Sequence, residues 1–92
     1  MQLLTQTNVA INQAMILATD KRPHSLLFYR NARGRLRLKV DQKTYAAATD
    51  LDFNIEGARC HIRIKDLGQY IGFVLTGSKK LLLVVPQEKT HE

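Results

Sequence analysis

Apolar side chains recur at helical spacing through the first twenty residues of the chain. They are separated by seven, four and three positions, which places them on one stripe of a helix. The stripe consists of Leu4, Ile11, Met15 and Ala18. The helix is expected to end before Pro23, because the residue preceding a proline avoids the helical conformation. This pattern predicts an N-terminal helix over residues 1–20.

After this segment the pattern changes to the two-residue alternation of β-strands. Residues 25–40 predict a hairpin whose turn is formed by residues 31–34. Apolar residues of its second strand face one side, and bases face the other. These outward bases are Arg35, Arg37 and Lys39. A symmetric turn then places Phe28 opposite Arg37 on the outer face of the hairpin.

Apart from Thr49, apolar side chains occupy the odd positions from Tyr45 to Ile55. This stretch predicts either one long strand or two strands with a bulge near Thr49. The dipeptide Gly57-Ala58 fits a two-residue hairpin turn, because glycine supplies the positive φ that such a turn requires. The hairpin pairs apolar residues with apolar residues and acids with bases. In this register, Asp52 lies opposite Arg63.

Two further strands are predicted at residues 70–76 and 81–85, joined into a last hairpin. The sequence therefore predicts an α+β fold, with the N-terminal helix packed on an antiparallel meander sheet of about five or six strands. The sheet is either open or curled toward a barrel. The 92 residues are expected to form a single α+β domain over residues 1–86, followed by a flexible polar tail at 87–92.

Positive charge is concentrated in one segment of the chain. The formal net charge is +6, and residues 21–40 contain seven bases and no acid. The rest of the chain contains seven bases and eight acids, so the whole excess comes from this segment. The predicted turn also sets Arg30 opposite Arg35, and like charges in that position destabilise a hairpin. Such an uncompensated arrangement is expected where a surface binds something.

The charge pattern predicts a small non-enzymatic protein that binds nucleic acid through a basic β-hairpin. Arginine and lysine side chains would contact phosphates, and an outward phenylalanine would stack on a base. Single strands are expected to be preferred, with low sequence specificity. The candidate binding residues are Phe28, Arg30, Arg33, Arg35, Arg37 and Lys39. Two alternatives need no ligand: a charged edge strand that blocks unwanted pairing, or neutralisation by a neighbouring acidic strand at residues 50–56.

The apolar C-terminal hairpin suggests a second function, that of a protein-interaction module. One helix covers only one face of the sheet, so an apolar face is left for a homo-oligomeric contact, most simply a homodimer. The module would be an adaptor or an inhibitor of a larger complex, docking through this hairpin or bringing the basic hairpin to an acidic protein. The candidate interface residues are Tyr70, Ile71, Phe73, Leu81, Leu83 and Val85.

Several classes of chemistry find no support in the sequence. His24, His61 and His91 have no metal-ligand spacing with Cys60, and no catalytic pair is evident, so neither a metal, a cofactor, an enzyme activity nor a small-molecule substrate is expected. No apolar run is long enough to cross a membrane, so no membrane partner is expected. A single cysteine is typical of a reducing compartment, which predicts a cytoplasmic protein.

Overall fold

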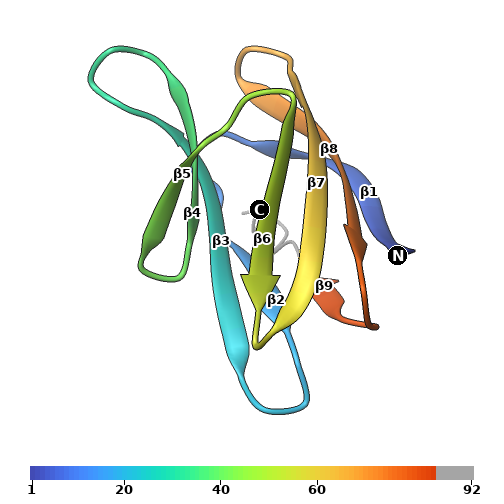
Figure 1. Cartoon of the computed structure of the whole chain (residues 1–92). Coiled ribbons are helices and arrows are strands. Elements are labelled where there is room, and N and C mark those ends of the chain that lie inside the picture. Colours follow the sequence, from blue (N-terminus) through green and yellow to red (C-terminus); the bar gives the residue numbers. More distant parts are fainter. Residues whose placement is uncertain (85–92) are drawn as a thin grey trace, which may run out of the picture.

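The computed structural model describes residues 1–84, which fold into nine β-strands and no helix (Figure 1). The strands are β1 (Gln2–Ala10), β2 (Met15–Ala18), β3 (Pro23–Arg30), β4 (Leu36–Val40), β5 (Lys43–Ala46), β6 (Asp50–Ile55), β7 (Ala58–Asp66), β8 (Tyr70–Gly77) and β9 (Leu82–Val84). They form two antiparallel sheets. One sheet has the order β1-β8-β7-β6, and the other has the order β5-β4-β3-β2-β9.

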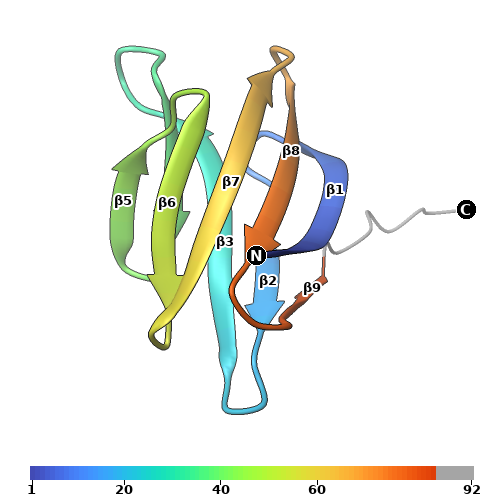
Figure 2. The ribbon, with the colours of Figure 1, turned by 45° about the vertical axis from the view of Figure 1, so that its right-hand side comes forward.

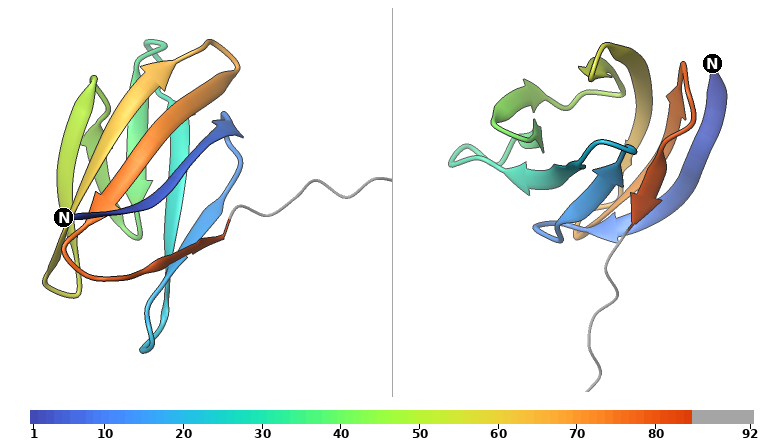
Figure 3. Two further views of the ribbon diagram at one scale, coloured as in Figure 1. Left: turned by 90° about the vertical axis from the view of Figure 1, so that its right-hand side faces the viewer. Right: turned by 90° about the horizontal axis from the view of Figure 1, so that it is seen from below.

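The two sheets pack as layers of a sandwich (Figures 2 and 3), and buried apolar side chains of both sheets form one core between them. The chain passes between the sheets at residues 11–14, 47–49 and 78–81. Side chains from both layers interdigitate in the core, where the ring centroids of Phe28 and Phe73 lie 5.7 Å apart. Phe28 comes from β3 and Phe73 from β8, so this contact joins the sheets near their centres.

The predicted N-terminal helix is wrong, because the first eighteen residues form β1 and β2 in different sheets. Inward Thr7 and Val9 alternate with outward Gln6 and Asn8 along β1. β-branched residues pack well on such a pleated surface. Asn12 adopts a left-handed conformation (φ 71°) and breaks the chain between the two strands. The fold is therefore all-β, and neither the α+β class nor a single meander describes it.

The strands predicted between residues 25 and 77 are confirmed, but the second hairpin has a different register. Its turn is formed by Glu56-Gly57, with φ values of 51° and 79°, rather than by Gly57-Ala58. Each residue therefore pairs two positions away from its expected partner. Asp50, for example, lies opposite Arg63. A two-residue shift preserves the faces, because side-chain direction repeats every two residues.

The stretch predicted as one or two strands at residues 45–55 consists of β5 and β6, separated by a change of sheet rather than by a bulge. The predicted C-terminal hairpin does not form either. β8 pairs with β1 and β7, whereas β9 pairs with β2 in the other sheet. The predicted tail at residues 87–92 lies outside the described residues. Within residues 1–84 no helix is long and apolar enough to cross a membrane.

Candidate functional site

The outer face of the β3–β4 hairpin carries two cations beside two apolar side chains. Tyr29 lies directly opposite Arg37, and Leu27 lies directly opposite Lys39. All four alternate with buried residues along their strands and therefore point away from the core. The predicted outward direction of Arg37 and Lys39 is confirmed. An aromatic ring and a guanidinium group thus lie side by side on a surface open to solvent.

The loop that joins β3 to β4 holds two more arginines in solvent. The side-chain oxygen of Asn31 accepts hydrogen bonds from the backbone amides of Arg33 (2.9 Å) and Arg35 (3.0 Å). Gly34 takes the positive φ of 77° that closes the loop. The local backbone is therefore tied by one asparagine, in the manner of an Asx turn. Both arginine side chains are exposed at its tip.

Phe28 is not part of this surface, and its predicted outward orientation is wrong. The loop contains five residues (31–35) rather than the expected four, so the strand pairing shifts by one residue and Phe28 faces Leu38. Phe28 is completely buried in the core. The outward aromatic is Tyr29, which is not among the predicted binding residues. We call Tyr29, Arg33, Arg35, Arg37 and Lys39 the basic hairpin.

Arg30 is also separated from the basic hairpin. Its guanidinium donates two hydrogen bonds to Asp66 (3.0 and 2.8 Å) and one to the carbonyl of Gly68 (2.8 Å). The hydrogen bonds to the Asp66 carboxylate raise the pKa of Arg30, and the same contact lowers the pKa of Asp66. Since Asp66 ends β7 and Arg30 ends β3, this ion pair connects the two sheets. It also neutralises the charge of Arg30 within the protein.

The cations of the basic hairpin have no acidic neighbour in the described part of the chain. Within residues 1–84, no carboxylate lies at ion-pair distance from the four bases. These bases are Arg33, Arg35, Arg37 and Lys39. The acidic strand that was expected as a possible neutralising neighbour belongs to the other sheet. There, Asp50 and Asp52 contact His61 at 2.9 and 2.7 Å.

A buried histidine between two carboxylates lies at the opposite end of β3. His24 is 2% exposed, and its ring nitrogens lie 2.7 Å from Asp41 and 2.7 Å from Glu56. The hydrogen bonds with Glu56 and then with Asp41 raise the pKa of His24. Thr19 also donates to Glu56 (2.7 Å). Sequence spacing gave no signal for this cluster, because Asp41 and Glu56 come from turns of different sheets.

The predicted interface residues are distributed between core and surface. Ile71, Phe73 and Leu81 are buried, and Leu83 is half-buried. Tyr70 is 55% exposed. Val85 lies outside the described residues. The exposed apolar side chains of the outer sheet face are instead Ile16, Leu82 and Val84, on β2 and β9.

Metal-binding and thiol chemistry have little basis in this arrangement. In the described part of the chain, no three His, Cys, Asp or Glu side chains are grouped to hold a metal ion. Cys60 is buried, and this burial raises the pKa of its thiol, which disfavours the reactive thiolate.

In comparisons with known proteins, no protein-family model, curated protein or solved structure matches the chain.

Proposed function

We propose that this protein binds single-stranded nucleic acid through the basic hairpin, without catalysis and with low sequence specificity. Arg33, Arg35, Arg37 and Lys39 supply four cations for phosphate groups. Phosphate contacts dominate the affinity of such interfaces and carry no sequence information. The single observation that carries the proposal is that no carboxylate of residues 1–84 pairs with any of these four bases.

Single strands are favoured because of Tyr29. Its ring lies on an open sheet face opposite Arg37, and an unstacked base has a face that can pack against such a ring. In a duplex the bases are stacked on each other and offer only their edges. A sheet face with an aromatic residue beside arginines therefore suits a strand whose bases are free.

The proposal is tested by fluorescence anisotropy with a labelled single strand of about 12 nucleotides, a length within the usual range of small binding surfaces. Binding is measured between about 50 and 200 mM salt. If all four cations contact phosphates, log K is expected to fall with log salt at a slope of about −2.8. An unlabelled duplex of the same sequence, added as a competitor, measures the preference for single strands.

Two double variants with the same loss of charge separate the basic hairpin from net charge. Arg35→Ala with Arg37→Ala is expected to reduce the salt slope by about 1.4 and to remove most of the affinity. Arg59→Ala with Lys79→Ala removes two exposed cations that lie outside the basic hairpin, and is expected to leave binding nearly unchanged. No binding at about 50 mM salt, or equal losses in both variants, would contradict the proposal.

Tyr29 has its own matched pair of variants. Tyr29→Ala is expected to weaken binding about 5- to 150-fold, because base stacking contributes about 1–3 kcal/mol. Tyr29→Phe keeps the ring and is expected to bind as well as the wild-type protein. Equal affinities of the alanine and phenylalanine variants would show that Tyr29 does not stack.

A second candidate function is a protein contact, most simply a homodimer. It is favoured by Ile16, which is exposed and lies directly opposite the exposed Val84 on the outer face of β2 and β9. Apolar side chains grouped on a surface are typical of protein interfaces. Sedimentation equilibrium distinguishes the outcomes: a concentration-dependent dimer that Ile16→Asp abolishes supports this candidate, and a monomer at all concentrations rejects it.

A further inference from the structure

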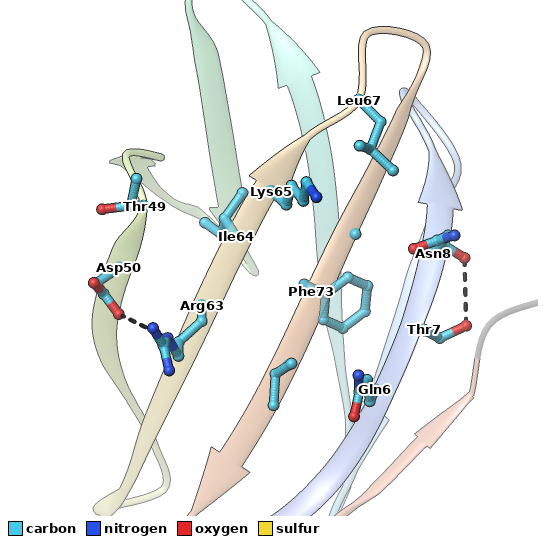
Figure 4. Close-up of a pocket in the computed structure, with 12 residues that line it drawn as sticks. Gln6, Thr7, Asn8, Thr49, Asp50, Arg63, Ile64, Lys65, Leu67 and Phe73 are labelled. Atoms are coloured by element: carbon cyan, nitrogen blue, oxygen red, sulfur yellow. Dashed lines mark hydrogen bonds and ion pairs between the residues drawn. The ribbon is translucent and has the colours of Figure 1, made fainter.

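A groove with a mixed polar and apolar lining runs along β8 on the outer face of the other sheet, away from the basic hairpin. β1 forms one wall and β7 the other, and the lining continues past β7 to Thr49 and to Asp50, the first residue of β6. The whole space has a volume of about 910 Å³. Two rows of directly opposed residues cross it. They are Asn8–Gly72–Lys65 and Gln6–Val74–Arg63. Figure 4 shows Lys65 extending from β7 toward β8, with Gln6 and Asn8 on the far side.

Gly72 leaves room for the side chain of Asn8 in the middle of this groove. It lies within β8, between two paired strands, where glycine is disfavoured. Its backbone does not have a positive φ, so its conformation does not require glycine. A Cβ atom at this position would lie 2.9 Å from the side-chain oxygen of Asn8. A glycine in a strand interior often marks a place where another group approaches the backbone closely.

The two walls have different chemistry. Lys65 has no carboxylate at ion-pair distance within residues 1–84, so its ammonium group is available to an anion. Arg63 is only loosely paired, because its Nε lies 3.9 Å from Asp50, and Asp50 is itself held by His61 at 2.9 Å. On the opposite wall, the carboxamides of Gln6 and Asn8 both donate and accept hydrogen bonds.

We propose that this groove binds a small organic oxyanion, with its anionic group on Lys65 and Arg63 and its hydroxyl groups toward Gln6 and Asn8. The walls are two strand spacings apart, roughly 10 Å, which admits a ligand of a few carbon atoms and excludes a nucleic-acid duplex. Val74 and Leu67 supply apolar contact for its carbon skeleton. A phosphate ester and a dicarboxylate share the required chemistry, so both serve as probes.

The test is a titration of the full chain with glycerol 3-phosphate, malate or inorganic phosphate, followed by amide chemical shifts. Saturable shifts are expected at Asn8, Lys65 and Gly72. If glycerol 3-phosphate binds more tightly than malate, the preferred anionic group is a phosphate ester, and the reverse order indicates a carboxylate. Weaker binding of inorganic phosphate than of glycerol 3-phosphate indicates that the carbon skeleton contributes to affinity. If none of the three probes gives saturable shifts in this groove, the proposal is overturned.

Three variants test the groove itself. Lys65→Gln is expected to weaken binding about tenfold, because it removes one charge-assisted hydrogen bond. Gly72→Leu fills the floor and is expected to abolish binding, and Lys65→Gln decides the matter if that variant does not fold. Arg59→Gln removes an exposed cation of the same strand outside the groove, and binding is expected to be unchanged. Equal losses in Lys65→Gln and Arg59→Gln would overturn the proposal as unspecific attraction.

Ligand binding in the groove and oligonucleotide binding on the basic hairpin can be tested independently. Oligonucleotide affinity is expected to be the same in Lys65→Gln as in the wild-type protein, since Lys65 and Arg37 lie on opposite sheets. A loss of oligonucleotide affinity in Lys65→Gln would make the groove part of a polyanion surface and overturn its assignment to a small ligand.

Discussion

At the residue scale, the most constrained polar side chain is His24. Both of its ring nitrogens lie 2.7 Å from carboxylate oxygens, an arrangement in which the imidazolium form donates both hydrogen bonds. Glu56 belongs to the β6–β7 turn and His24 to β3, so the contact joins the two sheets. At the other end of β3, Arg30 and Asp66 make the corresponding connection.

The His24 cluster predicts that stability decreases as the solution becomes alkaline. Hydrogen bonds with Glu56 and Asp41 raise the folded-state pKa of His24 above its ordinary value of 6.5. Its contribution is therefore complete below pH 6.5 and is lost as the pH rises through the raised pKa. Burial acts to raise the pKa of Asp41, but hydrogen bonds from His24 and Ser25 outweigh it, and the pKa is lowered. Thermal melting between pH 5 and 9 measures the effect.

Two variants distinguish His24 from the other paired histidine. His61 also has a raised pKa, because Asp52 and then Asp50 accept its hydrogen bonds, so it acts in the same pH range. His24→Gln is expected to destabilise the protein by about 3 kcal/mol at pH 6, since it breaks a buried charged contact, and to flatten the pH dependence. His61→Gln is expected to retain most of it. An unchanged pH profile in His24→Gln would contradict this assignment.

At the scale of elements, the length of the β3–β4 loop decides which aromatic residue is buried. Phe28→Ala is expected to cost about 3–5 kcal/mol because it leaves a cavity beside Phe73. Phe28→Leu is expected to cost about 1 kcal/mol, as a conservative exchange. Chemical denaturation measures both. If Phe28→Leu instead lost oligonucleotide binding at unchanged stability, the loop would have four residues and Phe28 would face outward.

The β6–β7 turn offers a second prediction. Gly57 has a φ of 79°, so Gly57→Ala is expected to destabilise the protein by about 1 kcal/mol, with a melting temperature lower by about 4–8 °C. Gly34→Ala, at φ 77°, provides a comparison in the other sheet, and no neighbouring atom obstructs a methyl group at either position. A neutral Gly57→Ala would indicate that this turn does not have the left-handed geometry.

The elements also show what the sequence could predict. Alternation correctly identifies the inward faces of β4, β6 and β7, because each strand has one buried side. Alternation does not fix the length of a turn. One extra residue in the β3–β4 loop turns Tyr29 outward in place of Phe28. The N-terminal helix is wrong because the four apolar residues at helical spacing lie on two strands and on the connection between them. Asn12, with a φ of 71°, lies between β1 and β2, and a residue in this conformation would interrupt a helix over residues 1–20.

At the scale of the whole molecule, the same error concealed the groove. Gly72 gives no phosphate-loop signal in the sequence, because no helix follows it. Its place in a groove depends on β1 lying beside β8, and a chain that begins with a helix has no β1. By contrast, the uneven distribution of charge is visible in the sequence, since seven bases occur in residues 21–40 without an acid. The strand order decides which sheet contains the acidic residues, and the strand order is known only from the structure.

Charge-reversal variants test whether oligonucleotide binding depends on the net charge of the protein or on where the charges lie. Arg35→Glu with Arg37→Glu lowers the net charge from +6 to +2, and so does Arg59→Glu with Lys79→Glu, since each substitution removes two units. Arg59 and Lys79 are exposed but lie outside the basic hairpin. A surface field is set by local charges, because exposed charges are screened beyond about 10 Å at moderate salt. The first variant is therefore expected to lose oligonucleotide binding more than a hundredfold, because two phosphate contacts are lost and two negative charges are added. The second variant is expected to lose less than about threefold.

Anisotropy at about 100 mM salt measures both, after melting curves establish that each variant is folded. Similar losses in the two variants would mean that binding follows net charge, and the basic hairpin would then have no special role.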